Sequence, residues 1–454
     1  MVNGIGKNVC MLGVGGISMS GIAQILVKYG HNVVGFDKTP TEVFDVLKSC
    51  QISCYQDGQT EFSMDFDTLI YTAAVNEEDY RIVNARKANK QILTRAEALK
   101  FIMDEYQMLV AISGSHGKTT TTAITANLLK SLKNFTAHVG GVLNENNSSL
   151  VLQGEKGCFL TEVCEYNRSF HQVFPDIGVI LNTDLDHVDT YQTKEDIVEA
   201  YIKFSNNIKP DGMLIINIDD DSAFDIITKT NKNKKIITIS LKNPLADYHI
   251  GKVVRTNEGV EFEVFKYGEI FNVFRFYRLG EHNLYNALFG VVIADVMGAR
   301  EEDIERQLAS FKGVKRRFQD IGRLNGARVI IDYAHHPHEI EKIIKEAKEI
   351  TKGKVYVCFQ PHTYTRTKHF WSEFVKSLLE ADSVIMYPIY GARENALPGV
   401  TSERMSADIR RSGGVCYYAS TFSEIKTYLK YFVQDKDIVL VLGAGDIGNI
   451  RLFD

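Results

Sequence analysis

Short runs of aliphatic residues alternate with helical patterns along nearly the whole chain. Met108 to Ile112 and Ile177 to Leu181 are continuous apolar runs, which are typical of strands buried on both faces of a sheet. Stretches with helical periodicity lie between such runs. The alternation predicts an α/β fold whose parallel sheets are built from βαβ units. One departure is Val253 to Tyr277, where polar and apolar residues alternate, which predicts an antiparallel insertion with one solvated face.

The length of the chain predicts several domains. At 454 residues it exceeds a single core, and three domains of about 150 residues are the starting expectation. The strand and helix patterns place these blocks at 1–106, 107–313 and 314–454. We expect Rossmann-like first and third domains and a central domain of the mononucleotide-binding, phosphate-loop type that carries the antiparallel insertion.

Charge and cysteine content narrow the class of protein. The net charge of −5 gives no global attraction to nucleic acid or to an anionic membrane surface. The seven cysteines are scattered and form no zinc-ligand pattern, so reduced core thiols in a cytoplasmic protein are expected. We see no secretory leader and no apolar run of about 18 residues. No nucleic-acid or membrane partner is expected.

The segment Gly114-Ser115-His116-Gly117-Lys118-Thr119-Thr120 follows a predicted strand and opens a predicted helix. A phosphate-binding loop needs that setting, because glycines let backbone N–H groups approach phosphate oxygens and the helix N-terminus is partially positive. Lys118 would reach the outer phosphates and Thr119 would bind Mg²⁺. Ile112 stands where the common pattern has its first glycine. The alternative is a glycine turn followed by a chance Gly-Lys-Thr.

A second glycine-rich turn, Gly13 to Gly21, also lies between a strand and a helix. It suits a pyrophosphate, and Asp37 at the end of the next strand could contact a ribose or a base. Ser18 replaces the third glycine of the dinucleotide pattern. A nicotinamide-dependent dehydrogenase and a purely structural turn therefore remain open at this point.

Acidic and imidazole groups follow the strands of the central block. Glu162 comes just after Cys158 to Thr161, and a second group follows Ile177 to Leu181. Strand carboxyl ends share one edge of a parallel sheet, so we expect these groups to face the phosphate loop. Carboxylates and a neutral imidazole are plausible Mg²⁺ ligands. The second group consists of Asp184, Asp186, His187 and Asp189.

Further candidate contacts lie toward the C-terminus. Asn283 and Asn286 open a predicted helix and could contact a nucleotide, although Asn283 could instead cap that helix. The basic run Lys312 to Phe318 suggests phosphate contact, with a solvated linker as the alternative. Segments that follow third-block strands could hold a second substrate, with Arg366 on a carboxylate and His335 orienting an amine. Gly443 to Gly448 matches a dinucleotide pattern, but only six residues follow it, so a glycine loop at a domain junction is expected.

Together these segments resemble the Mur ligases, the ATP-dependent amide-bond-forming enzymes of peptidoglycan assembly. The segments are GVGGISMSGIA, GSHGKTTTTA, NTDLDHVDTY, GEHNLYNAL, KRRF, DYAHHP, FQPHTYTRT and LGAGDIG. They occur in the family's order and extend over all three blocks. The resemblance implies a UDP-sugar-binding domain over 1–106, an ATP-binding domain over 107–313 and an amino-acid-binding domain over 314–454.

The resemblance also implies roles for individual residues. ATP would be bound by Gly114, Ser115, His116, Gly117, Lys118, Thr119, Thr120, Asn283, Asn286, Arg317 and Asp332. The UDP-sugar would be bound by Gly15, Gly16, Ile17, Ser18, Met19, Ser20, Asp37 and Thr72. The amino acid would be bound by Tyr333, His335 and Arg366. The metal ion would be bound by Thr119, Glu162 and His187, and the catalytic residues would be Lys118, His187 and His335.

The implied reaction uses ATP and Mg²⁺ to join L-alanine to UDP-N-acetylmuramate through an acyl phosphate, giving ADP and phosphate. We expect a monomer or a weak homodimer. The chain departs from the family at two places: Glu162 to Asn167 keeps the first Glu of the E-A-D-E-S-D stretch but not the later Asp residues, and Thr363 stands where many members have Arg. A sister ligase that adds a preformed peptide is the nearest alternative. A nucleotide-switched binding protein is the alternative from another class.

Overall fold

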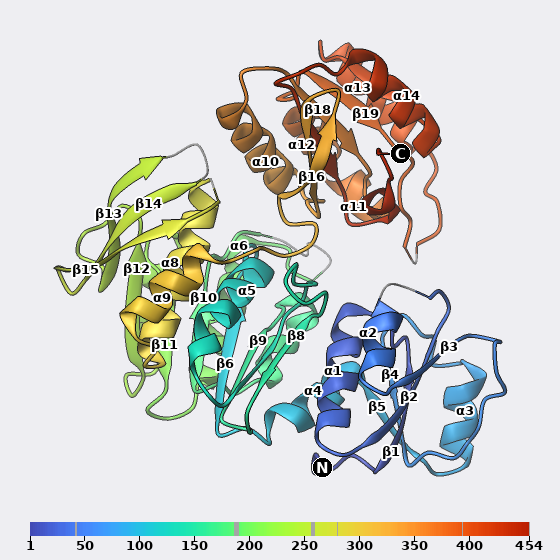
Figure 1. Cartoon of the computed structure of the whole chain (residues 1–454), viewed down its shortest axis with the longest axis vertical. Helices are drawn as coiled ribbons and strands as arrows, with labels where there is room; N and C mark the ends of the chain where they lie inside the picture. Colours follow the sequence, from blue (N-terminus) through green and yellow to red (C-terminus); the bar gives the residue numbers. More distant parts are fainter. Residues whose placement is uncertain (41–42, 186–189, 256–258, 279, 393, 454) are drawn as a thin grey trace. The chain divides into compact units, whose positions relative to one another are not determined.

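The computed structural model describes residues 1–40, 43–185, 190–255, 259–278, 280–392 and 394–453. These residues form three β-sheets with helices packed against them (Figure 1). Contacts divide the chain into two compact units, Met1–Val314 and Lys315–Asp454. The expected α/β architecture with three sheet domains is confirmed.

The first sheet is parallel, with the strand order β3-β2-β1-β4-β5. Its order reverses between β1 and β4, so the loops after these two strands lie at the point where open α/β sheets bind ligands. The strands are β1 (Asn8–Leu12), β2 (Asn32–Asp37), β3 (Ser53–Gln56), β4 (Thr68–Tyr71) and β5 (Gln91–Thr94). The helices are α1 (Ile17–Lys28), α2 (Val43–Ser49), α3 (Tyr80–Lys87) and α4 (Arg95–Met103).

The central sheet has the order β15-β14-β13-β12-β11-β10-β6-β9-β7-β8. Strands from β12 to β7 in this order are parallel, and β8 is antiparallel to β7. The strands are β6 (Met108–Ser113), β7 (Phe135–His138), β8 (Leu150–Gln153), β9 (Cys158–Glu162), β10 (Ile177–Ile180), β11 (Met213–Asn217), β12 (Lys235–Ser240), β13 (Tyr248–Arg255), β14 (Val260–Lys266) and β15 (Glu269–Phe276). The helices are α5 (Lys118–Leu128), α6 (Lys194–Asn207), α7 (Ala223–Lys229), α8 (Glu281–Val296) and α9 (Glu301–Ala309), with short 3₁₀ turns at Leu129–Ser131 and Tyr166–Gln172.

The predicted antiparallel insertion is confirmed. Strands β13, β14 and β15 pair antiparallel and extend the edge of the central sheet through β12. In β14 the side chains of Phe262 and Val264 are fully buried, whereas Glu261 and Glu263 are partly exposed. This alternation follows from the two-residue period of a strand with one solvated face.

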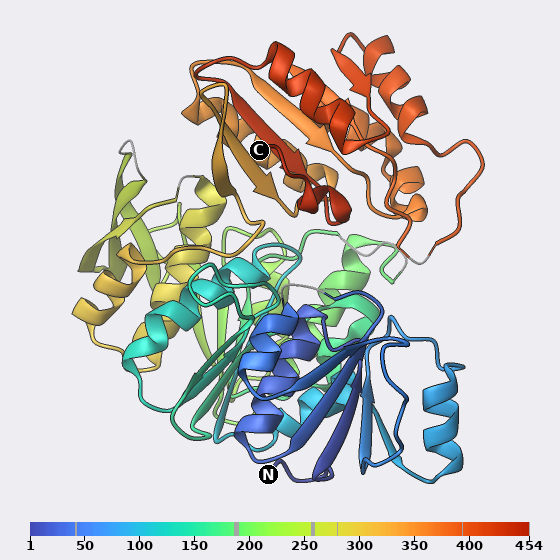
Figure 2. The same cartoon turned by 45° about the vertical axis from the view of Figure 1, so that its right-hand side comes forward.

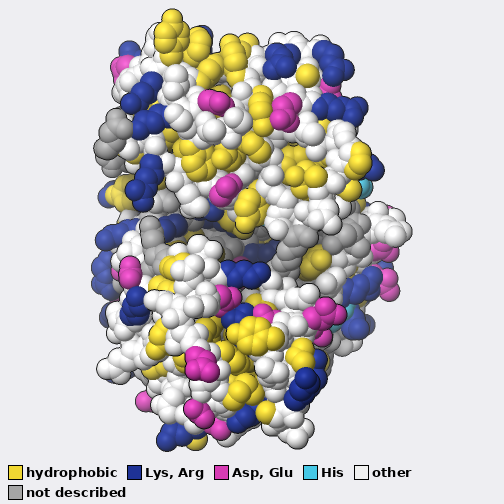
Figure 3. All heavy atoms as spheres, turned by 90° about the vertical axis from the view of Figure 1, so that its right-hand side faces the viewer, with side chains coloured by type: hydrophobic (Ala, Val, Ile, Leu, Met, Phe, Trp, Pro, Cys, Tyr) yellow, Lys and Arg dark blue, Asp and Glu magenta, His cyan; other side chains and the backbone are white. Residues whose placement is uncertain are grey.

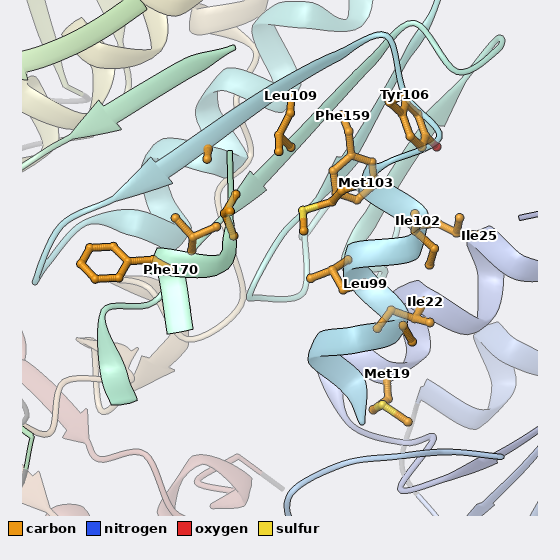
Figure 4. Close-up of a cluster of buried hydrophobic side chains, with 14 of the residues drawn as sticks. Met19, Ile22, Ile25, Leu99, Ile102, Met103, Tyr106, Leu109, Phe159 and Phe170 are labelled. Carbon is orange, nitrogen blue, oxygen red and sulfur yellow. The ribbon is translucent and has the colours of Figure 1, made fainter. Parts of the chain in front are cut away.

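The first sheet and the central sheet share a hydrophobic core. Met19, Ile22 and Ile25 of α1 lie beside Leu99 and Ile102 of α4, and the cluster continues into the central sheet (Figure 4). The central residues labelled there are Tyr106, Leu109, Phe159 and Phe170. Burying these side chains stabilises both sheets together, at roughly 25 cal/mol for each Å² of apolar surface removed from water. Because α1 packs into this shared core, the core also fixes the position of the loop that connects β1 to α1.

The second unit has the order β16-β17-β21-β18-β19-β20, in which only β16 is antiparallel among the described strands. Buried side chains pack helices α10 and α12 against one face and α14 against the other (Figure 2). The strands are β16 (Gln319–Leu324), β17 (Ala327–Asp332), β18 (Val355–Phe359), β19 (Ser383–Met386), β20 (Cys416–Tyr418) and β21 (Ile438–Leu442). The helices are α10 (Pro337–Ile350), α11 (Tyr364–His369), α12 (Trp371–Leu378), α13 (Ser402–Arg411) and α14 (Phe422–Phe432), with a 3₁₀ turn at Asp446–Asn449.

The surface and the thiols agree with the composition. Charged side chains of both signs are interspersed on the face that Figure 3 shows, as expected for a small net charge. All seven cysteines are free thiols; five are buried as expected of core thiols, whereas Cys50 is half-buried and Cys164 is exposed. Among the described residues, no helix is both long enough and apolar enough to cross a membrane.

Candidate active site

The phosphate loop connects β6 to α5 at the point where the central sheet reverses its order. Gly114 and Gly117 have φ values of 146° and 84°, a region that side chains other than glycine rarely occupy. No side chain caps the first turn of α5, which begins at Lys118. Its first backbone N–H groups therefore have no helical acceptor and are available to phosphate oxygens.

The end of β10 fixes the shape of this loop. The N–H of His116 donates to Oδ1 of Asn182 at 2.8 Å, and the N–H of Ser115 donates to the Asn182 carbonyl at 3.2 Å. The Ser115 hydroxyl donates to the Asp184 carbonyl at 2.5 Å. Sequence analysis did not single out Asn182, although its place directly after a buried strand was a usable signal.

Lys118 is held by its own loop and by a buried carboxylate. Its Nζ donates to the Gly114 carbonyl at 2.5 Å and lies 3.0 Å from Oε2 of Glu165. Burial by itself would lower the pKa of Lys118, but the Glu165 carboxylate outweighs burial and raises that pKa above its ordinary value. Lys118 is therefore charged. Sequence analysis missed Glu165, which belongs to the altered stretch after Glu162.

The expected metal ligands Thr119 and Glu162 lie against one glycine pair. A Cβ on Gly140 would be 1.7 Å from Oε1 of Glu162, and a Cβ on Gly141 would be 2.9 Å from the methyl carbon of Thr119. The Thr119 hydroxyl forms no hydrogen bond to any residue that the structure describes. A carboxylate and a hydroxyl are the oxygen donors that Mg²⁺ prefers, so this pair fits the metal ion.

The rest of the expected metal set is incomplete. His187, Asp186 and Asp189 lie outside the described residues, and the described part of the chain holds no cluster of three or more His, Cys, Asp or Glu side chains arranged as a metal site. Asp184 is described, and its Oδ2 lies 3.6 Å from Nε2 of His116. The role of His187 stays a prediction.

The two asparagines of α8 are both buried. Oδ1 of Asn286 accepts a hydrogen bond from the Thr121 hydroxyl at 3.0 Å, and a Cβ on Gly117 would be 2.5 Å from that oxygen. Asn286 therefore fixes α5 and the phosphate loop against α8. The alternative that Asn283 caps the helix is wrong, because α8 begins at Glu281 and its cap position is Gly280.

Residues at the ends of the two neighbouring strands, β2 and β4, fix the glycine turn after β1. The N–H of Gly15 donates to Oδ2 of Asp37 at 2.9 Å, and a Cβ on Gly13 would be 2.4 Å from the methyl group of Thr72. Asp37 and Thr72 thus shape the turn. No side chain caps α1, so its first N–H groups are open to an anion.

Two of the predicted UDP-sugar-binding residues of this turn have buried side chains. Met19 belongs to the core that Figure 4 shows, and Ser20 is buried and donates its hydroxyl to the Ile17 carbonyl at 2.8 Å. A ligand at this turn would meet their backbone groups only. Gly15, Gly16, Ile17 and Ser18 remain partly or largely exposed.

In the second unit, Asp332 closes β17 and organises the basic run. Its carboxylate accepts hydrogen bonds from the N–H groups of Phe318 at 2.6 Å and Ala334 at 2.7 Å. Burial raises the pKa of Asp332 to about 6, against the charge of Arg317. Arg316 donates to the carbonyls of Gly443 and Gly445. The terminal glycine loop therefore binds a side chain of its own unit.

Three expected amino-acid-site residues follow β17 and β18. The guanidinium of Arg317 lies 5.4 Å from the centroid of the Tyr333 ring. Nδ1 of His335 lies 3.0 Å from the Tyr333 carbonyl; a carbonyl only accepts, so Nδ1 carries the proton. Nε2 of His335 is then a lone-pair acceptor. The rings of His335 and His362 have centroids 5.8 Å apart.

Burial, together with the charge of Arg366, lowers the pKa of both histidines to about 4. Both rings are therefore neutral near pH 7. Arg366 lies on α11 after Thr363, whose φ of 65° is strained for a β-branched residue. The structure brings His335, His362 and Arg366 together; sequence analysis had not singled out His362.

The comparisons with known proteins cover all three sheets. Residues 8–107 match the Mur ligase family catalytic domain, 112–294 the Mur ligase middle domain, and 316–445 the Mur ligase glutamate ligase domain. The chain belongs to the Mur ligase family. The matched segments contain both glycine loops and the His335–Arg366 group of this Mur ligase.

Similar proteins extend over the full length of this Mur ligase. It is 38% identical to the UDP-N-acetylmuramate–L-alanine ligase of Clostridium tetani over 97% of this chain and 96% of that protein. The crystal structure of UDP-N-acetylmuramate-alanine ligase from Thermotoga maritima is 25% identical, with a TM-score of 0.80 and 98% of both chains covered. A murein peptide ligase from Psychrobacter arcticus shares the fold at 20% identity, with a TM-score of 0.72 over 98% and 97% of the two chains.

Proposed function

We propose that this chain is an ATP-dependent ligase that joins L-alanine to UDP-N-acetylmuramate in peptidoglycan biosynthesis. The phosphate loop, with Lys118 charged at its centre and the first turn of α5 uncapped, carries the ATP-dependent part of this proposal. The choice of L-alanine rests on the relatives that match nearly the whole chain.

The first step forms an acyl phosphate. An oxygen of the substrate's lactyl carboxylate attacks the γ-phosphorus of ATP, and the bond from that phosphorus to the β–γ bridging oxygen breaks. ADP leaves with the bond's electron pair. Lys118 and the N–H groups of α5 face the charge that develops on the phosphoryl oxygens, and such stabilisation is commonly the largest contribution to a rate.

Mg²⁺ is part of this proposal. Thr119 and Glu162 would hold it, with His187 as a further predicted ligand, and a bound Mg²⁺ supplies positive charge that neutralises phosphate oxygens. Gly140 and Gly141 leave room beside both side chains. Glycine at both positions is consistent with a site that needs close approach.

The second step forms the amide. The neutral amine nitrogen of L-alanine attacks the acyl carbon and forms a tetrahedral intermediate. The bond from that carbon to the phosphate oxygen then breaks, phosphate leaves with the electron pair, and the proton that the nitrogen loses passes to the departing phosphate. Arg366 would bind the carboxylate of alanine, and Nε2 of neutral His335 would accept a hydrogen bond from the amine and orient its lone pair. A pKa of about 4 makes His335 a weak base, so we assign it to orienting the amine.

The sister-ligase alternative differs only in the incoming amine. The murein peptide ligase that shares this fold is 20% identical, which carries no argument for its substrate. We propose a cytoplasmic enzyme, because the reaction consumes ATP and free thiols persist in a reducing compartment. We also propose that it acts as a monomer or a weak homodimer.

Phosphate release tests the proposal. Release from ATP is measured with and without UDP-N-acetylmuramate, and with alanine, glycine, serine or a tripeptide as the amine. We expect release that requires the sugar nucleotide and is fastest with L-alanine. Preference for the tripeptide would assign the sister activity, and release without a sugar nucleotide that a protein partner stimulates would assign a nucleotide switch.

A further inference from the structure

Arg95 occupies the carboxyl edge of the first sheet. It is the first residue of α4 and directly follows β5, where Thr94 pairs in register with Tyr71 of β4. The next residue after Tyr71 is Thr72, which contacts the glycine turn after β1. Arg95 therefore starts at the edge where the turn and Thr72 lie.

The side chain of Arg95 has little to neutralise it. Its Nη1 donates one long hydrogen bond, 3.3 Å, to the hydroxyl of Ser18. The guanidinium is half-buried, and it forms no ion pair with a carboxylate anywhere in the described residues. Burial lowers the pKa of Arg95, which records the cost of holding this charge partly away from water. An arginine stays protonated nonetheless.

Ser18, the partner of Arg95, is fixed in place. Its carbonyl accepts a hydrogen bond from Nε2 of His138 at 3.2 Å, and His138 is fully enclosed at the end of β7. Helices α1 and α4 pack through the apolar side chains labelled in Figure 4. The guanidinium and the uncapped start of α1 are therefore held side by side on rigid elements.

Arg95 and the uncapped start of α1 both face the place of an anion at the glycine turn. We expect the pyrophosphate of a sugar nucleotide there, because open N–H groups at a helix N-terminus bind phosphate oxygens.

We propose that Arg95 is a substrate-binding residue that grips the pyrophosphate of the sugar nucleotide, together with the backbone N–H groups at the start of α1. This inference rests on the proposed function. The guanidinium fork presents paired donors to phosphate oxygens, which adds orientation as well as affinity. Among the described residues no carboxylate forms an ion pair with Arg95, so the phosphates of the ligand would neutralise this half-buried cation on binding.

Titration calorimetry with four ligands tests the assignment. UDP carries uridine and the pyrophosphate, UDP-N-acetylglucosamine adds a sugar, UDP-N-acetylmuramate adds the carboxylate, and N-acetylmuramic acid carries the carboxylate without uridine and the pyrophosphate. We expect Arg95→Gln to weaken the three UDP ligands by similar factors of about tenfold to a hundredfold, the range of a charge-assisted hydrogen bond. Arg95→Lys should retain part of the affinity. Arg86→Gln, on the exposed surface of α3, is the matched control and should bind like the wild type.

Three results would overturn the inference. If Arg95→Gln binds all ligands as the wild type does, Arg95 has no role in binding them. If only the affinity for UDP-N-acetylmuramate falls, Arg95 contacts the carboxylate and not the pyrophosphate. A wild-type chain that binds UDP-N-acetylmuramate but not UDP removes the pyrophosphate site itself. ATP binding by the variant serves as the folding control. Failure of the proposed function is distinct, because the wild type would then bind no sugar nucleotide or form no product.

Discussion

Nζ of Lys118 lies 3.0 Å from Oε2 of Glu165, and the side chain of Glu165 has no exposed surface. The same ammonium donates to the Gly114 carbonyl. A carboxylate of the protein itself thus neutralises the lysine that we expect to meet phosphate. ATP would supply the same charge, so the pair links the stability of the free chain to its affinity for nucleotide.

Glu165→Gln tests this link. Breaking a buried ion pair leaves the other charge uncompensated, at a cost of roughly 3–5 kcal/mol. We expect the variant to melt earlier than the wild type without ligand and to gain more from saturating Mg-ATP, because the phosphates restore the missing charge. Calorimetric melting temperatures with and without Mg-ATP measure both effects. Glu341→Gln, from an exposed pair with Lys345, should change neither.

Lys118→Ala removes the cation that we propose faces the transferring phosphoryl group. We expect no detectable ADP release even when all substrates saturate, because the developing charge loses its main protein donor. Coupled ADP assays on the wild type and the variant give the comparison. Lys100→Ala, which removes an exposed lysine paired with Asp104, should leave turnover intact. Near-normal turnover of Lys118→Ala would refute the role.

Arg366→Gln tests the amino-acid site of the second unit. Loss of a charge-assisted contact to the alanine carboxylate should raise KM for L-alanine about tenfold or more, with a smaller change for ATP. The variant should also raise the pKa of His335 and His362, because the charge of Arg366 lowers both. Histidine NMR titrations follow the second effect. Arg411→Gln, from an exposed pair on α13, should leave KM and the titrations unchanged.

Local sequence predicted the parts whose causes are local. β6 and β10 are continuous apolar runs in the centre of a parallel sheet, and the glycines of the phosphate loop have the positive φ values that demand glycine. The alternation of polar and apolar residues correctly predicted the antiparallel insertion. The alternative that Asn283 caps the helix was wrong, because α8 starts at Glu281, two residues earlier than the pattern indicated, and Gly280 is its cap position.

The partners that sequence analysis missed are distant in sequence. Glu165 lies 47 residues from Lys118, and Asn182 lies 66 residues from His116. Their contacts exist because β9 and β10 flank β6, and strand order follows from the whole topology. A carboxylate or an amide after a strand indicates a site edge, but it does not identify the side chain that it will meet.

His138 gives the chain a pH dependence in its first unit. Burial lowers the pKa of His138 to about 4, while in the unfolded chain it titrates near 6.5. The unfolded state therefore binds more protons between these values, so stability is lost as the pH falls from about 6.5 to 4. The contribution is roughly 3 kcal/mol at most.

We expect His138→Gln to be less stable than the wild type at pH 7 but to lose less stability on acidification to pH 4.5. Scanning calorimetry at both pH values gives the four melting temperatures needed. His338→Gln replaces an exposed histidine at the start of α10 and should retain the wild-type acid sensitivity. An equal acid-induced shift in His138→Gln and the wild type contradicts the assignment.

Gly140→Ala tests whether Glu162 must remain beside Thr119. The new Cβ would lie 1.7 Å from Oε1 of Glu162, so the carboxylate must move while the chain keeps its fold. We expect a large loss of turnover that added Mg²⁺ partly restores, because displacing a ligand weakens metal affinity rather than removing the phosphate loop. Gly298→Ala is the control: its φ is 81° and nothing lies within 4 Å of the added carbon, so it costs about 1 kcal/mol of backbone strain without touching the site. If turnover depends on Mg²⁺ equally in Gly140→Ala and Gly298→Ala, Glu162 does not bind the metal ion.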